Sequence, residues 1–277
     1  MSEILYSKEE YLVLDLNNQE RSEIKYEISK FPDGQRSIEI LGPLPSSIVA
    51  IKSRCLWSDL ELIVAANSFM KNDYSLATVL FITYLGGGRS DRQFNENQVN
   101  YLRDVIAPVI NSCEFSHVSI YDPHSDVSEA VIKKATPITN YDLVKEATES
   151  ASGIKCLIVP DQGAYKKSHT IEDLFDKVVC CTKTRNLSTG EVTVTVPIND
   201  IDHTDYCFVV DDICDGGQTF LRIGEQLGFL KIQPELIVSH GIFSKGTNDL
   251  LLYYGKIYTT NSYQTLSKRH NVITYNI

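Results

Sequence analysis

The segment at 206–220, YCFVVDDICDGGQTF, holds the residue types best suited to binding a phosphorylated sugar. An apolar strand there ends in two adjacent carboxylates, Asp211 and Asp212, which can hold ribose hydroxyls. The loop that follows and opens a helix consists of Asp215, Gly216, Gly217, Gln218 and Thr219. Its glycines let backbone N–H groups wrap a phosphate, and the start of a helix adds positive potential. An ordinary strand-to-helix turn would explain the glycines, but not two carboxylates closing an apolar strand.

The pattern of the whole chain predicts the elements that position this loop. Short β-branched runs alternate with amphipathic stretches, which is typical of parallel sheets covered by helices. Strands are expected at 47–51, 77–83, 117–120, 155–159, 177–182, 206–210 and 236–240, and helices at 59–71, 95–111 and 219–227. A polar, acidic stretch at 138–153 precedes a new strand. We therefore expect one domain at 1–146 and a second at 147–277.

Composition excludes several classes of protein. The chain has 277 residues, of which 43% are hydrophobic and 22% charged, as in folded proteins. Its 26 Lys and Arg against 36 Asp and Glu give a net charge of −10, which argues against non-specific binding to nucleic acid or to an anionic membrane. The seven cysteines lack CxxC spacing, and no segment reads as a signal peptide or membrane span, so free thiols and a cytoplasmic location are expected.

The loop at 211–219 resembles the phosphoribosyl-diphosphate-binding loop of type I phosphoribosyltransferases and of ribose-phosphate pyrophosphokinases. Two further segments favour the second family. FPDGQ at 31–35 is similar to its Phe-x-Asp-Gly-Glu, which reaches the base of the nucleotide bound by a neighbouring subunit, and LGGGRSDR at 85–92 is similar to its ATP-binding Tyr-x-Arg-Gln-Asp-Arg. The resemblance assigns ATP binding to Phe31, Asp33, Gln35, Arg89, Ser90, Asp91 and Arg92.

Other fragments follow in the family's order, up to the Thr-Asn-Ser at 260–262. YDPH at 121–124 and VPDQG at 159–163 are similar to the segments that carry the family's magnesium ligands, which implies that His124 and Asp161 bind Mg²⁺. CTKTR at 181–185 keeps the Lys-x-Arg of the mobile catalytic loop, which implies catalytic roles for Lys183 and Arg185. Taken singly, His124 would more often be a structural histidine and the two cations a solvated loop. The resemblance rests on the order of these fragments, which is the same as in the family.

The resemblance implies an α/β fold of two type I phosphoribosyltransferase-like domains, each a mainly parallel sheet flanked by helices. It further implies a homodimer or larger homo-oligomer that moves the β,γ-diphosphate of MgATP to the anomeric hydroxyl of a ribose 5-phosphate moiety and releases AMP. In this reaction the protein mainly aligns the reactants and stabilises the charge on the phosphoryl oxygens. The loop from Asp211 to Thr219 would hold the acceptor.

Three departures from the family leave the acceptor open. Gln35 replaces a Glu, Ser90 replaces a Gln, and the residues at 216–218 are Gly-Gly-Gln where the family usually has Thr-Ala-Gly or Thr-Gly-Gly. Ribose 5-phosphate is the expected acceptor. The alternative is ADP-ribose, as in phage-type ADP-ribose pyrophosphate synthetases that rebuild NAD. A second alternative is a catalytically silent phosphoribosyl-binding regulatory protein, although such a protein would not need the expected metal ligands and loop cations together.

Overall fold

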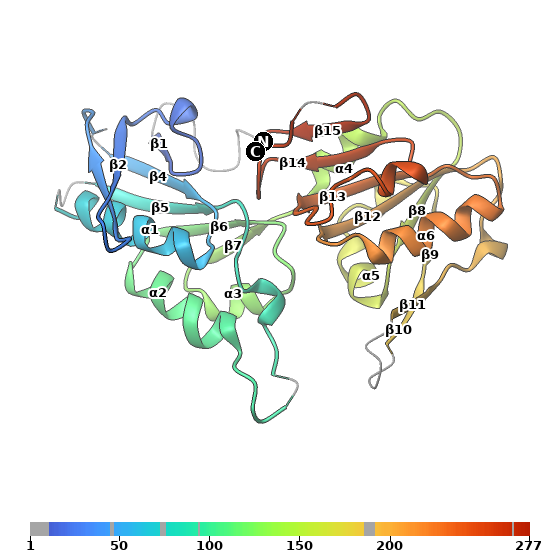
Figure 1. The fold of residues 1–277 in the computed structure, drawn as a ribbon, viewed down its shortest axis with the longest axis horizontal. Helices are drawn as coiled ribbons and strands as arrows, with labels where there is room; N and C mark the ends of the chain where they lie inside the picture. The colour runs from blue at the N-terminus through green and yellow to red at the C-terminus, as the bar shows by residue number, and fades with distance from the viewer. Residues whose placement is uncertain (1–10, 45–46, 73–75, 94, 186–191, 268) are drawn as a thin grey trace. The chain divides into compact units, whose positions relative to one another are not determined.

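The computed structural model describes residues 11–44, 47–72, 76–93, 95–185, 192–267 and 269–277, and of residues 185 and 192 it describes the backbone alone (Figure 1). The chain divides into two compact units, Met1–Ile138 and Thr139–Ile277. Each unit has its own parallel sheet and its own apolar core. Among the described residues, no helix is long and apolar enough to cross a bilayer.

The first unit is built on a five-stranded sheet in the order β1-β4-β5-β6-β7, in which all neighbouring strands are parallel. Its strands are β1 (Tyr11–Asp15), β4 (Ile48–Ser53), β5 (Ala77–Ile82), β6 (His117–Tyr121) and β7 (Ala135–Ile138). Its helices are α1 (Trp57–Met70), α2 (Ala107–Ser112) and α3 (Val127–Val131), and β2 (Tyr26–Lys30) and β3 (Arg36–Ile40) form an antiparallel hairpin. Runs of consecutive buried residues in β4 and β5 are typical of a parallel sheet covered on both faces.

The second unit is built on a six-stranded parallel sheet in the order β15-β14-β13-β12-β8-β9. Its strands are β8 (Lys155–Val159), β9 (Lys177–Cys180), β12 (Tyr206–Cys214), β13 (Glu235–Gly241), β14 (Ile257–Thr260) and β15 (Val272–Tyr275). Its helices are α4 (Tyr141–Thr148), α5 (Gln162–Ser168) and α6 (Gln218–Phe229), and β10 (Thr182–Arg185) pairs with β11 (Val192–Thr195) as an antiparallel ribbon. One apolar cluster includes the buried face of α6 and another that of α4.

Two parallel sheets flanked by helices confirm the predicted α/β class. Some predicted bounds differ from the structure. The helix expected at 95–111 becomes helical only after Asn100, whose side-chain oxygen accepts from the N–H of Arg103 at 2.9 Å and so caps it. The strand expected at 177–182 is divided at Cys181 into β9 and β10. The division expected at 146 falls within α4, whereas this helix packs on β13 and β14 and lies wholly in the second unit.

All seven cysteines are free thiols, and all except Cys180 are buried, as the sequence predicted.

Candidate functional site

The two adjacent carboxylates lie on β12 itself. The strand was expected to end at Val210, but it continues to Cys214 because Asp211 pairs with Val238 of β13 and Cys214 with Gly241. Since successive side chains of a strand alternate between its faces, the two carboxylates have different surroundings. Asp212 is 7% exposed, and its Oδ2 lies 3.5 Å from Nζ of Lys167 on α5. Asp211 is half-buried and is the more accessible of the two.

Burial and the neighbouring Asp212 carboxylate raise the pKa of Asp211 well above its ordinary value, and Asp161 adds to the effect. The end of β12 is therefore a place where negative charge is already costly. A ligand that brings hydroxyl donors or a cation would relieve this cost, whereas a bare anion placed against the carboxylates would increase it.

The loop after β12 leads into α6 through Gly217, which has a φ of +77°. A Cβ at this glycine would also lie 3.3 Å from Cδ2 of Leu250, so both conformation and space favour glycine. Because the residue before α6 has no side chain, no side chain caps the helix. The first N–H groups of α6 thus have no side-chain partner at Gly217, and phosphate binding by this loop stays a prediction.

A second loop, at 242–246, lies against the first and was not among the residues predicted from the sequence. The N–H groups of Ile242 and Phe243 donate to the carbonyl of Cys214 at 2.9 and 3.0 Å. Ser244 donates to Asp215 twice, through its N–H to the carbonyl at 3.1 Å and through its hydroxyl to Oδ1 at 2.7 Å. Asp215 thus joins the two loops. The available signal was the polar SKG at 244–246 directly after an apolar strand.

Asp161 follows β8, the neighbour of β12, and both of its carboxylate oxygens have partners. Oδ1 accepts from the N–H groups of Gly163 and Ala164 at 2.9 and 3.0 Å, which caps α5, and Oδ2 lies 3.1 Å from Nζ of Lys183 on β10. Burial alone would raise the pKa of Asp161, but the Ala164 N–H and the Lys183 ammonium outweigh it and hold the pKa below its ordinary value. Lys183 and Asp161, predicted separately, are in contact. The side chain of Arg185 lies outside the described residues.

In the first unit, the segment at 85–92 is held against the end of β4 by a glycine. The Gly86 N–H donates to the carbonyl of Cys55 at 3.1 Å, and a Cβ at Gly86 would collide with that oxygen. The chain then turns through Gly87, with a φ of +77°, into a single 3₁₀ turn at Gly88–Ser90. This places Arg89 and Arg92 on the surface, where the Arg92 side chain is 69% exposed.

Asp91, between these cations, is only 7% exposed. Its carboxylate accepts from the hydroxyl of Ser125, and its carbonyl accepts from the side-chain amide of Asn100 at 2.6 Å. Ser125 directly follows His124, and a Cβ at Gly88 would lie 3.9 Å from that of His124. The structure thus brings the predicted nucleotide segment and the predicted metal ligand together. Asp91, expected to bind ATP, holds the His124 loop through Ser125.

The segment at 31–35 is the turn of the β2–β3 hairpin. The Phe31 N–H donates to the carbonyl of Gln35 at 2.8 Å, and the Gln35 N–H donates to Oδ1 of Asp33 at 3.1 Å. Gly34 has a φ of +97°, which favours glycine at this position. The turn leaves the Phe31 side chain 52% exposed within its unit. Such a ring on a projecting turn is suited to contact another molecule.

The Thr-Asn-Ser near the end of the chain has a structural role in the second unit. Thr260 Oγ1 donates to the Ser239 carbonyl at 2.7 Å, and Ser262 Oγ lies 2.7 Å from Nδ1 of His240. Both hydroxyl-bearing residues are buried, so they join β14 to β13 and are not accessible to a ligand.

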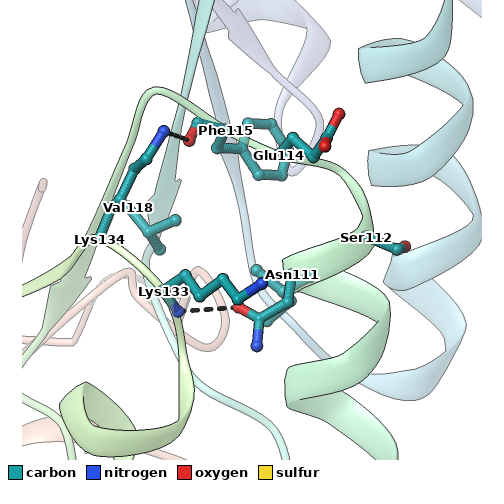
Figure 2. Close-up of a pocket in the computed structure, with 8 residues that line it drawn as sticks. Asn111, Ser112, Glu114, Phe115, Val118, Lys133 and Lys134 are labelled. Carbon is teal, nitrogen blue, oxygen red and sulfur yellow. Dashed lines mark hydrogen bonds between the residues drawn. The ribbon is translucent and has the colours of Figure 1, made fainter.

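A pocket of about 310 Å³ lies at the amino end of β6, the opposite end from the loop with His124 (Figure 2). No predicted site residue lines it. The polar groups that line it include donors already used within the chain, since the Lys134 ammonium donates to the Phe115 carbonyl at 3.2 Å and the Lys133 N–H donates to Oδ1 of Asn111 at 2.8 Å (Figure 2). Nothing in this pocket matches the chemistry that the sequence predicts.

His124 and Asp161 belong to different units, so their pairing as metal ligands stays a prediction. The Asp161 carboxylate fits Mg²⁺, because it is a hard oxygen ligand that already attracts a cation. His124 is exposed, and its assignment as a ligand rests on the resemblance. Two protein ligands would leave further coordination positions to phosphate oxygens and water, as Mg²⁺ usually requires. Among the described residues there is no cluster of three or more side chains arranged to hold a metal on their own.

The chain is similar over most of its length to ribose-phosphate pyrophosphokinases, although no protein-family model matches it. It is 24% identical over 230 residues to the ribose-phosphate pyrophosphokinase of Pyrococcus furiosus, covering 81% of each chain. To that of Sulfolobus acidocaldarius it is 26% identical over 253 residues, which are 86% of this chain and 84% of the relative. The structure of the phosphoribosylpyrophosphate synthetase from Mycobacterium smegmatis matches with a TM-score of 0.76 and 12% identity, over 96% of this chain and 94% of that one. The resemblance predicted from short fragments is therefore confirmed as a distant, nearly full-length similarity.

Proposed function

We propose that this chain, a distant and nearly full-length relative of ribose-phosphate pyrophosphokinases, is a Mg²⁺-dependent diphosphotransferase of the cytoplasm. It would move the β,γ-diphosphate of ATP to the anomeric hydroxyl of a ribose 5-phosphate moiety and release AMP. The observation that carries the proposal is the end of β12, where two carboxylates precede a glycine loop and an uncapped helix start. A phosphorylated sugar matches both parts, because its phosphate suits the N–H groups and its hydroxyls suit the carboxylates.

On the acceptor side, the accessible Asp211 would accept hydrogen bonds from the ribose hydroxyls, while Lys167 holds Asp212. Hydroxyl donors are favourable beside this carboxyl, whose pKa is raised by burial and by Asp212. The N–H groups at the start of α6 would receive the phosphate, together with the hydroxyl of Thr219. The loop at 215–219 would thus orient the anomeric hydroxyl without itself taking part in bond formation.

On the donor side, Arg89, Ser90 and Arg92 would bind the nucleotide, and Asp91 would hold their loop beside His124. His124 and Asp161 would serve as ligands of Mg²⁺, which would supply positive charge against the phosphates of ATP. Lys183 would leave Asp161 and, with Arg185, contact the transferring group as its charge develops. These few local cations suffice in a chain of net charge −10, because charges are screened beyond about 8 Å at physiological salt.

The decisive assay supplies MgATP with one candidate acceptor at a time and separates the nucleotide products by chromatography. We expect AMP to appear in step with the pyrophosphorylated acceptor. ADP in stoichiometric amounts would contradict the assignment as a diphosphotransferase. If no acceptor supported turnover, a catalytically silent regulatory protein would be favoured. Ribose 5-phosphate is the first acceptor to test. ADP-ribose is the second, because glycine at 216 lacks the side chain with which the family's usual threonine would close off an extension of the phosphate.

The exposed turn at 31–35 supports a homo-oligomer in which Phe31, Asp33 and Gln35 contact the nucleotide base held by a neighbouring subunit. A mixture of Phe31→Ala and Lys183→Ala subunits should then regain part of the activity that each lacks alone, because hybrid assemblies contain some intact sites. Light scattering on the same samples provides the control, because it measures the oligomeric state of the active protein. A protein that is fully active as a monomer would rule this arrangement out.

A further inference from the structure

The side chain of Lys245, in the loop after β13, lies against Gly216 in the loop after β12. A Cβ at Gly216 would be 3.8 Å from Cε and 3.9 Å from Cδ of Lys245, and 3.9 Å from Oγ of Ser244. These are ordinary van der Waals distances. The aliphatic stem of the lysine therefore runs along the side of the loop that glycine leaves bare, and the ammonium is one bond beyond Cε.

The backbone around Lys245 is fixed relative to the phosphate loop. Ser244 is bonded to Asp215 through both its N–H and its hydroxyl, at 3.1 and 2.7 Å. On the other side, the Gly246 N–H donates to the Phe243 carbonyl at 2.7 Å and closes a tight turn, in which Gly246 has a φ of +73°. The position of Lys245 beside Gly216 is thus set by the hydrogen bonds of its neighbours.

The charge of Lys245 differs from that of two other lysines at this end of the sheet. Lys167 lies 3.5 Å from Asp212, and Lys183 lies 3.1 Å from Asp161. Lys245 is exposed and has no hydrogen bond or ion pair with any side chain or backbone group in the described part of the chain. The nearby hydroxyl of Ser244 is already donated to Asp215. The Lys245 ammonium is therefore available as a charged donor for a ligand on this side of the loop.

We propose that Lys245 binds a phosphate of the acceptor, providing the donor and the charge that a glycine at 216 cannot provide. The inference rests on the proposed function, since it places the acceptor phosphate at the start of α6. A threonine at position 216 would offer one neutral hydroxyl close to that phosphate. An ammonium on a long stem is a stronger partner for a phosphate and reaches further outward. Gly216 and Lys245 are thus a complementary pair, in which the glycine makes room for the lysine stem.

The test is steady-state kinetics of Lys245→Gln, with Lys231→Gln as a matched control. Lys231 is an exposed lysine just beyond the carboxyl end of α6, the end opposite the phosphate loop. Lys245→Gln should raise the KM for the acceptor about tenfold, the usual order for a lost charged hydrogen bond, and change the KM for ATP less than twofold. If Lys245→Gln raises the KM for ribose 5-phosphate more than that for ADP-ribose, the ammonium binds a terminal phosphate. If it raises the KM for ADP-ribose more, the ammonium binds the second phosphate of a diphosphate.

A pair of variants tests the complementarity directly. In the wild-type background, Gly216→Thr should weaken acceptor binding, because the branched side chain crowds the Lys245 stem. In the Lys245→Gln background, the same substitution should recover part of the affinity, because its hydroxyl replaces the lost donor. If Gly216→Thr changed the affinity for the acceptor equally in both backgrounds, the proposal that Gly216 and Lys245 act as a pair would be wrong.

Calorimetric binding of ribose 5-phosphate and ADP-ribose separates this inference from the proposed function. If the wild-type protein releases AMP and Lys245→Gln binds and uses both acceptors normally, the inference is wrong and the proposed function stands. If the wild-type protein binds an acceptor but releases no AMP, the proposed function is wrong, and the calorimetric affinity of Lys245→Gln decides the inference. If the wild-type protein binds neither compound, both are wrong.

Discussion

The two units present their candidate residues in opposite ways. In the first, the cations Arg89 and Arg92 lie on an exposed loop whose position depends on a buried carboxylate, Asp91. In the second, the charged residues lie on or directly after strands, and two of the carboxylates are paired with lysines. The first region therefore depends on an anchor, whereas the second contains ion pairs, of which the proposed reaction would open the one between Lys183 and Asp161. Substitutions in the two units should therefore differ in their effects on activity and on stability.

The largest effect is expected at an ion pair of the second unit. Lys183→Ala should lower kcat by roughly 10³-fold or more with a much smaller change in KM, because a catalytic cation contacts the phosphoryl charge mainly in the transition state. Arg185→Ala should act in the same direction. Steady-state kinetics checks both, and Thr184→Ala, an exposed neighbour on β10, provides the control. A near-normal kcat in the two cation variants would show that this strand is not catalytic.

In the first unit, the anchor and the surface cation should behave differently. Asp91→Ala leaves the Ser125 hydroxyl without its partner and removes a buried carboxylate, so the free energy of unfolding should fall by about 1–3 kcal/mol. Arg92→Gln should leave the unfolding free energy almost unchanged and raise the KM for ATP roughly tenfold. Urea denaturation and kinetics on the same samples measure both quantities. If Arg92→Gln destabilised the protein as much as Asp91→Ala, the distinction between anchor and cation would be lost.

The smallest expected effects are on the pH dependence of stability, which should have opposite signs for two carboxylates of the second unit. The pKa of Asp211 is raised in the folded state, so its contribution to stability is present below about pH 4 and is lost as the pH rises. Asp211→Asn should therefore stabilise the protein at pH 7 and have less effect near pH 4. The pKa of Asp161 is lowered, so its contribution is present above about pH 4 and is lost as the pH falls.

Asp161→Asn is the matched variant, because asparagine caps a helix as well as aspartate does but cannot pair with Lys183. It should destabilise the protein at pH 7 and have less effect at low pH. The unfolding free energies of both variants and of the wild type, measured between pH 4 and pH 8, provide the comparison. Shifts of the same sign in the two variants would contradict the assigned electrostatics.

Features that depend on neighbouring residues could be predicted from the sequence, whereas contacts between segments far apart in the chain could not. The glycine loop at 215–219 was predicted because glycine and aspartate determine local conformation. The extension of β12 through Asp211 and Asp212 depends on pairing with β13, which the residues of β12 alone do not encode. Short strands such as β14 and β15 were missed because their stability comes from their neighbours.

The same reason explains the site residues that were missed or placed differently. Ser244 and Lys245 matter only because the loops after β12 and β13 lie side by side, which is a consequence of strand order. Asp91 was expected to bind ATP because the segment at 85–92 resembles the family's ATP-binding segment, whereas its burial against Ser125 depends on a loop from another strand. The ends of parallel strands bring such loops together, so the missing information was topological.

The most direct test of the central claim uses ATP that carries a label in its β-phosphate, with ribose 5-phosphate and ADP-ribose offered separately. If the chain transfers a diphosphate, the label leaves the nucleotide completely, appears in the sugar product, and equals the amount of AMP formed. If the label stays in the nucleotide as ADP, or if no acceptor draws it out of ATP, the chain is not a pyrophosphokinase.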